Sequence, residues 1–288
     1  MEIVVKVNKF EDIEKLNNVS SYLLANKNFS YRFDESFSLS KIKIVKKYCV
    51  KNNKKVYVLI NKIFKDEDLA SLKEFMKKLL KINVDGFYFT DFAVFMIAKE
   101  LNVADKCYFY HETFLRNTYD ILTYQEYGIK NIICSKDMNI NDIKNLPINK
   151  KDTYGILCFG YFPLYESQRK ILTNYANINK LDKKLVKSNN LFLKEATRDS
   201  INRVIEQNGT SSIFNSEVLS YLSFIKKLSE NIGIFIIDGL FFNVDYLYKV
   251  IDLFKKAINE EVDESKLKEL DPSMEFTTAF LIKRIGLM

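Results

Sequence analysis

The chain has 288 residues, a formal net charge of +7 and 47% hydrophobic residues. This length and hydrophobic content are sufficient for one large domain of barrel size. The sequence has no apolar run of about 18 residues, which a transmembrane helix needs. Its first residues also lack the basic start, apolar stretch and cleavage site of a signal peptide. We therefore expect a cytoplasmic protein with no membrane contact.

Four cysteines are present: Cys49, Cys107, Cys134 and Cys158. They lie in apolar strand-like or helix-like runs and form no C-x-x-C pair, so we interpret them as reduced, buried thiols. This spacing does not favour a metal or iron–sulfur site. The positive net charge is compatible with a nucleic-acid partner. However, the lysines are scattered along the whole chain, so the charge alone does not distinguish this partner from others.

Short apolar runs alternate with amphipathic segments along the chain. The apolar runs predict eight strands, at residues 2–7, 22–25, 55–60, 85–89, 107–110, 130–134, 154–159 and 232–237. The amphipathic segments predict helices at residues 9–18, 38–51, 66–82, 92–101, 117–128, 140–145, 216–229 and 244–258. Nearly every predicted strand is therefore followed by a helix.

Eight such units of roughly 25–30 residues are typical of a (β/α)8 barrel. We predict an α/β fold, a TIM-like barrel over residues 1–260. The seventh unit is longer, because a polar segment rich in lysine and asparagine, residues 176–215, contains short strand-like pieces. This segment predicts a small β-insertion after strand 7. Residues 261–288 are predicted to form a C-terminal extension packed on the barrel, and an open doubly wound sheet is the alternative fold.

Residues 153–175, TYGILCFGYFPLYESQRKILTNY, predict a buried strand that delivers polar and aromatic groups just beyond its end. Gly160 allows the backbone to turn there, and Pro163 prevents a simple continuation of a sheet. In α/β proteins such a position often forms part of a binding site. An ordinary connection between a strand and a helix is the alternative interpretation.

Polar residues follow the other predicted strands as well, where a barrel presents its functional groups. His111 is the only histidine of the chain and the one group that titrates near neutral pH, so it is the first catalytic candidate. The alternative is a hydrogen-bonded structural histidine. For Asp91 and Asp137 the alternative is capping of the following helices, which is the more typical role of a lone aspartate before a helix. One histidine with scattered carboxylates does not form a typical metal site, and we expect none.

Several segments resemble the U32 (collagenase-like) peptidase family. The GYFPL segment that begins at Gly160, followed by Ser167 and Arg169, resembles the family pattern G-[RY]-x-P-L/M…S-x-R. Residues 54–72, 84–101, 108–138 and 213–258 resemble further family segments in the same order. Within residues 108–138, the matching positions are His111, Asn117, Gly128, Ser135 and Asp137, where Asp137 replaces the usual glutamate.

The resemblance implies a barrel fold and one of several activities. Family members include peptidases of unknown catalytic type and RNA or quinone hydroxylation factors, and one branch hydroxylates tRNA uridine with two related subunits. We therefore expect tRNA uridine hydroxylation, with tRNA and a paralogous subunit as partners. The alternatives are a collagenase-like peptidase, for which we can place no nucleophile–base pair, and a non-catalytic RNA-binding scaffold.

Many branches of the family bind an iron–sulfur cluster through four cysteines, one of them just after the S-x-R step. In this chain that position is Lys170, and no cysteine follows Cys158. We therefore expect no cluster in this chain.

The resemblance and the strand-end positions together select the candidate residues. Arg169 is expected to hold a phosphate or carboxylate bidentately, and His111 to hydrogen-bond a base or transfer a proton. The predicted catalytic residues are His111, Asp137 and Arg169. The predicted substrate-binding residues are Asn61, Asp91, Asn117, Ser135, Gly160, Tyr161, Ser167 and Asp238.

Overall fold

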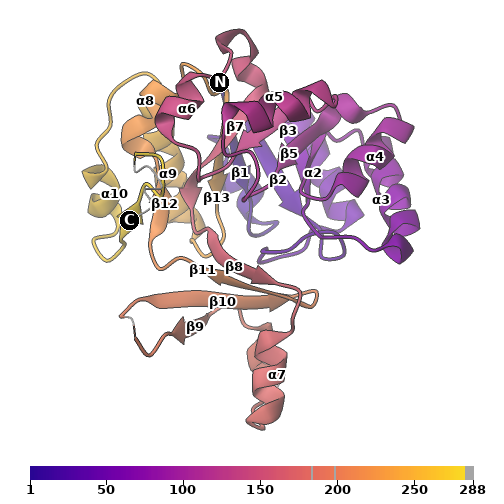
Figure 1. Ribbon diagram of the computed structural model, residues 1–288, viewed down its shortest axis with the longest axis vertical. Coiled ribbons are helices and arrows are strands. Elements are labelled where there is room, and N and C mark those ends of the chain that lie inside the picture. Colours follow the sequence, from indigo (N-terminus) through magenta and orange to yellow (C-terminus); the bar gives the residue numbers. More distant parts are fainter. Residues whose placement is uncertain (183, 198, 283–288) are drawn as a thin grey trace.

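The computed structural model describes residues 1–182, 184–197 and 199–282, and within these ranges eight parallel strands form a closed barrel (Figure 1). The strands are β1 (Glu2–Lys6), β2 (Ser21–Ala25), β3 (Lys55–Ile60), β4 (Gly86–Phe89), β5 (Cys107–Tyr110), β6 (Asn131–Cys134), β7 (Tyr154–Gly160) and β13 (Ile234–Asp238). Strand β13 pairs in parallel with both β7 and β1, which closes the sheet. The predicted (β/α)8 barrel is therefore confirmed, and the open sheet is wrong.

Helices cover the outside of the barrel (Figure 1). They are α1 (Asp12–Lys15), α2 (Leu39–Lys51), α3 (Leu69–Ile82), α4 (Phe92–Glu100), α5 (Thr118–Glu126), α6 (Ile140–Lys144) and α9 (Val244–Ala257). Helix α3 shows why they form, because it buries Leu72, Phe75, Met76 and Leu79 at the three- and four-residue spacing of one helix face. None of the helices in the described ranges is long and apolar enough to cross a membrane.

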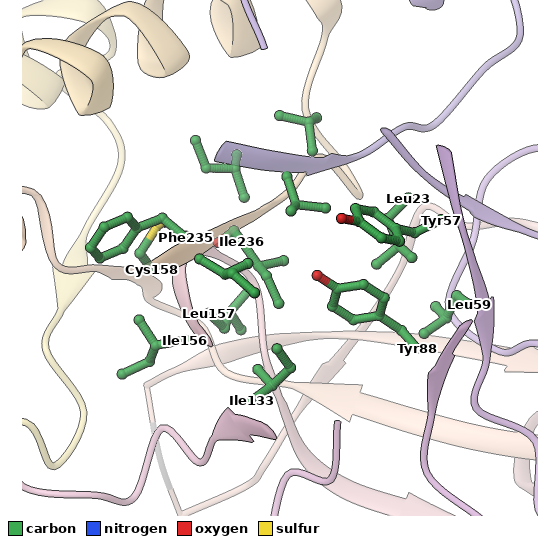
Figure 2. Packing of buried hydrophobic residues seen from close by; sticks show 14 of the residues in the cluster. Leu23, Tyr57, Leu59, Tyr88, Ile133, Ile156, Leu157, Cys158, Phe235 and Ile236 are labelled. Atoms are coloured by element: carbon green, nitrogen blue, oxygen red, sulfur yellow. Dashed lines mark hydrogen bonds between the residues drawn. The ribbon is translucent and has the colours of Figure 1, made fainter. Parts of the chain in front are cut away.

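The interior of the barrel is filled with apolar and tyrosine side chains (Figure 2). The rings of Tyr57 and Tyr88 have centroids 5.2 Å apart, and Tyr108 stacks on Tyr88 at 4.7 Å. The Tyr57 hydroxyl donates a hydrogen bond to Glu2 at 2.8 Å, at the N-terminal end of the strands. Because the interior is packed, it leaves no room for a ligand inside the barrel. Barrels of this kind bind their ligands at the mouth, where the C-terminal ends of the strands lie.

A second sheet projects from the mouth of the barrel, below it in Figure 1. In the described part of the chain this antiparallel sheet has four strands in the order β8–β11–β10–β9. They are β8 (Pro163–Ser167), β9 (Leu191–Lys194), β10 (Ile201–Gln207) and β11 (Thr210–Phe214), with helix α7 (Ile171–Ile178) beside them. The predicted β-insertion after strand 7 is confirmed. Its sheet begins before residue 176, because Pro163 opens β8 directly after β7, at a strand start where its missing N–H is tolerated.

The helix predicted at residues 216–229 is wrong over most of its length. The segment contains strand β12 (Val218–Ser220), the 3-10 helix η5 (Leu222–Phe224) and only a short helix, α8 (Ile225–Leu228). Strand β12 pairs antiparallel with the end of β7 and parallel with β14 (Phe276–Thr277), which follows helix α10 (Ser265–Leu270). Residues 218–220 form a strand because they pair with β7, and the periodicity of the sequence does not reveal this pairing.

We predict that Gly160→Ala destabilises the protein by about 2–4 kcal/mol. Gly160 ends β7 with a φ of +136°. An added Cβ would lie 2.8 Å from the Cβ of Asp238 and 2.9 Å from its carbonyl oxygen. Denaturant unfolding measures the loss. Gly209→Ala is the control, because Gly209 also has a positive φ but meets only the end of Lys170, at 3.6 Å. Equal losses in both variants would show that the close approach to Asp238 contributes nothing.

Candidate functional site

A cavity of about 270 Å³ lies at the mouth, between the C-terminal ends of β3 to β5 and strand β8 of the insertion. We call it the mouth cavity. Its lining consists mainly of polar side chains: Arg32, Asn61, Ile63, Thr90, His111, Glu112, Thr113, Glu166, Ser167 and Gln168. Larger hollows occur beside α8 and between α2 and α3, on the helical outside of the barrel and away from the strand ends. Another larger cavity lies at the rim of the barrel. The mouth cavity is the candidate site because three predicted residues, Asn61, His111 and Ser167, line it.

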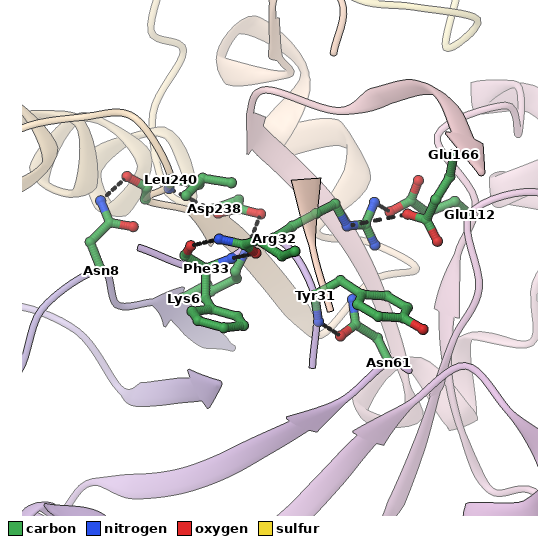
Figure 3. Close-up of polar contacts among 12 residues, drawn as sticks. Lys6, Asn8, Tyr31, Arg32, Phe33, Asn61, Glu112, Glu166, Asp238 and Leu240 are labelled. Carbon is green, nitrogen blue, oxygen red and sulfur yellow. Dashed lines mark hydrogen bonds and ion pairs between the residues drawn. The ribbon is translucent and has the colours of Figure 1, made fainter. Parts of the chain in front are cut away.

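Arg32 lies at the centre of a charge network in this cavity (Figure 3). Its Nη1 pairs with Oε1 of Glu112, and its Nε lies 3.7 Å from Oε2 of Glu166 on β8. The Arg32 side chain is only 13% exposed. Desolvation alone would lower the pKa of Arg32, but the two carboxylates raise it, so the guanidinium stays charged. Desolvation raises the pKa of Glu112 against the opposing effect of Arg32. The network joins the insertion to the barrel.

A second ion pair lies at the C-terminal ends of the barrel strands, next to this network. Nζ of Lys6, at the end of β1, lies 2.7 Å from Oδ2 of Asp238, at the end of β13 (Figure 3). Both side chains are largely buried. Desolvation lowers the pKa of Lys6, although Asp238 opposes this shift. Asp238 also accepts a hydrogen bond from the Leu240 N–H at 2.9 Å. Asp238 is therefore engaged with the barrel and does not line the mouth cavity.

His111 follows β5 and lines the mouth cavity. Its Nδ1 lies 3.3 Å from the backbone N–H groups of both Thr113 and Phe114, which donate to it. Desolvation lowers the pKa of His111, so the ring is neutral at pH 7. Since Nδ1 accepts, the proton of the neutral ring lies on Nε2, which has no hydrogen-bond partner among the described residues. His111 can therefore donate one hydrogen bond to a ligand.

Two more predicted residues lie at the cavity, and two others cap helices. Asn61 and Ser167 line the cavity. The Oδ1 of Asn61 accepts a hydrogen bond from the N–H of Tyr31 at 2.8 Å, which fixes the loop that carries Arg32. Asp91 caps α4 by accepting from the Ala93 N–H. Asn117 caps α5 in the same way.

The remaining predicted residues lie outside the cavity. Ser135 donates to the carbonyl of Glu112 at 2.6 Å and so supports the cavity wall. Asp137 is largely buried in ion pairs with Lys136, at 2.9 Å, and with Arg116, at 3.1 Å. Gly160 and Tyr161 form the link from β7 to the insertion.

Arg169 is not among the residues that line the mouth cavity, although Ser167 and Gln168, just before it, are. Strand β8 intervenes between β7 and Arg169, so this residue lies on the insertion, where it is exposed. Its predicted binding of a phosphate or carboxylate stays a prediction.

Sequence reasoning did not select Arg32, Thr90, Glu112 or Glu166, all of which line the cavity. Thr90 and Glu112 directly follow β4 and β5, so the strand-end rule contained a signal for both. Arg32 lies within the loop of residues 26–38 after β2 and has a left-handed φ of 59°. No sequence pattern brings this loop to Glu166.

The family model described as Peptidase family U32 matches residues 16–284. The chain belongs to this family. The chain is 25% identical over 260 residues to "tRNA hydroxylation protein P2" of Bacillus subtilis. The aligned region covers 88% of this chain and 84% of that protein. An uncharacterized protease of Methanocaldococcus jannaschii is 23% identical over 237 residues, 78% of this chain and 56% of that protein. A solved U32 peptidase aligns with a TM-score of 0.49 and 9% identity, over 83% of this chain and 92% of that one.

Proposed function

We propose that this U32 protein takes part in the hydroxylation of tRNA uridine, in the cytoplasm and together with a second family member. The observation that carries the proposal is its similarity to tRNA hydroxylation protein P2 across 88% of the chain. The net charge of +7 also supports a nucleic-acid partner.

The mouth cavity suits the role of holding a single base. At about 270 Å³ it is small for a ligand site, and its polar lining suits a base turned out of its stack. Nε2–H of His111 is available to donate to a base carbonyl, and the carboxylate of Glu112 to accept from a base N–H. We assign to these residues the binding and orientation of the base.

Mass spectrometry of tRNA nucleosides from a deletion strain tests the proposal. Hydroxyuridine should be lost on deletion and restored when the gene is returned. Unchanged hydroxyuridine in the deletion strain would contradict it.

A peptidase is the alternative that the family name suggests, but the cavity gives it less support. The four cysteines are buried. The Thr113 hydroxyl lies 3.2 Å from Nδ1 of His111, yet that nitrogen also accepts from two backbone N–H groups. A general base would need it free.

The second subunit is proposed to contact helix α7, which projects from the insertion sheet on the side away from the barrel (Figure 1). Ile171, Tyr175 and Ile178 form an apolar stripe on α7 and are 36%, 60% and 80% exposed. Exposed apolar stripes at this spacing are typical of protein contacts. We predict that a tagged protein purifies with a second U32 protein, and that Tyr175→Lys with Ile178→Lys abolishes this. Tyr119→Lys on α5, where the side chain is 83% exposed, is the control. Co-purification that survives the double substitution would exclude α7 as the contact.

We also propose that this chain holds no iron–sulfur cluster. Cys49 lies on α2, whereas the other three cysteines lie on β5, β6 and β7. Burial raises the pKa of Cys49, Cys107 and Cys134 to about 12, which opposes the thiolate form that ligates iron. Within the described ranges, no three or more His, Cys, Asp or Glu side chains are arranged to hold a metal. The donor set therefore does not fit a cluster.

Protein purified without oxygen is accordingly expected to contain no stoichiometric iron and to show no visible charge-transfer band. Elemental analysis and an absorption spectrum measure this. Several irons per chain would overturn the proposal.

A further inference from the structure

A second polar cavity lies at the rim of the barrel, between the insertion and the loops that follow β1, β2 and β13. It has a volume of about 460 Å³, and we call it the rim cleft. Lys9, Lys15 and Arg203 bring positive charge to its lining, and Asp34, Asn189 and Asn190 bring hydrogen-bonding groups. Nothing in the role of the mouth cavity uses these residues.

Arg203, on β10, is held in the rim cleft by aromatic rings. Its guanidinium carbon lies 4.9 Å from the ring centroids of both Phe192 and Phe241, and 5.2 Å from that of Tyr161. These rings come from the barrel and from the insertion. The guanidinium carbon lies over these rings, which fixes the position of the group by cation–π contact. In the described part of the chain, the Arg203 side chain has no hydrogen-bond acceptor and no carboxylate partner.

A guanidinium that is oriented but has its donors free is suited to bind an oxyanion through two parallel hydrogen bonds. The cleft is not simply basic, because Glu11, Asp12 and Asp34 also line it. An inorganic anion alone would gain little from such a mixed lining. A ribose phosphate matches it better, since it offers an anion to Arg203 and the lysines and a 2′-hydroxyl to Asp34 or the asparagine amides.

The rim cleft and the mouth cavity share one wall. Arg32 lines the mouth cavity and Asp34 lines the rim cleft, two residues apart on the loop after β2. The side chain of Gln207, at the end of β10, holds this loop by donating to the Phe33 carbonyl at 2.6 Å and accepting from its N–H at 3.2 Å. An RNA strand with one base in the mouth cavity would therefore pass its backbone along the cleft.

We propose that the rim cleft binds the sugar–phosphate backbone of RNA, with Arg203 holding a phosphate. The identity of the ligand as RNA rests on the proposed function, whereas the anion site rests on the geometry of Arg203.

Binding of an unmodified tRNA transcript to the full-length protein, followed by fluorescence anisotropy over a range of salt concentrations, tests the inference. Arg203→Met keeps a long side chain among the rings and removes the charge. It should weaken binding about tenfold and lower the slope of log K against log salt by about one. Arg203→Lys should retain part of the affinity. Lys130→Met is the control, because Lys130 is exposed at the opposite end of the barrel, beside the start of β6.

Wild-type affinity and salt slope in Arg203→Met would overturn the inference. A second contradicting result would be that Arg203→Met and Arg203→Lys lose the same affinity and also the same melting temperature. Arg203 would then be a structural residue. A single-stranded DNA that binds as well as the RNA of the same sequence would overturn the part that assigns the ribose. Binding needs no hydroxylation, so a deletion strain that keeps its hydroxyuridine would refute the proposed function and leave the cleft untouched.

Discussion

Arg32→Ala is expected to abolish hydroxyuridine formation and to lower the free energy of unfolding by about 3 kcal/mol. The substitution leaves Glu112, 26% exposed, and Glu166, 32% exposed, facing each other without the cation that separates them. It also releases the contact between β8 and the barrel at the mouth cavity. Complementation of the deletion strain measures the function, and denaturant unfolding measures the stability.

The double variant Arg32→Met with Glu112→Gln separates the two effects. It removes both charges of the Arg32–Glu112 pair and keeps the side-chain volumes. Only Glu166, 32% exposed, then lacks its cation, so most of the stability should return. Hydroxylation should stay absent if the charged pair serves the substrate. A double variant that is stable and also active would show that the pair only joins the insertion to the barrel.

The strands of the barrel could be predicted from the sequence because each is a short apolar run, and most are buried on both faces. β7, for example, is buried along its whole length, from Tyr154 to Gly160. The position of His111 at the mouth could also be predicted, since a residue directly after a barrel strand lies at the C-terminal end of the barrel. Local pattern and the strand-end rule were sufficient for these features.

Pairing between distant segments could not be predicted. Residues 216–229 have the spacing of a helix, but the open end of β7 binds Val218–Ser220 as a strand. Arg169 appeared to follow strand 7 because β8, with its proline and polar residues, does not look like a strand. Arg32 meets Glu166 only because the insertion folds back over the loop after β2. The charge network of the site therefore depends on tertiary contacts that leave no local pattern.

His111→Ala is expected to reduce hydroxyuridine at least about 100-fold, in the range of a lost acid–base or hydrogen-bonding group. The melting temperature should stay within a few degrees, because His111 is only half-buried. Its ring stacks on Phe114 at 4.0 Å and lies 6.1 Å from the ring of Phe109. Lys184→Ala, an exposed residue of the insertion, is the control and should be nearly silent.

His111→Gln distinguishes a hydrogen-bond donor from a proton carrier, because the glutamine amide can donate in place of Nε2–H but cannot titrate. The pKa of His111 is lowered from 6.5 by desolvation. Its neutral form is therefore complete above pH 6.5 and is lost as the pH falls through the lowered pKa, and protonation then also opposes folding. If His111 only donates, His111→Gln should keep activity and lose this acid limb of the pH profile. Loss of activity at every pH in the Gln variant would make His111 a proton carrier, and full activity in His111→Ala would remove it from the site.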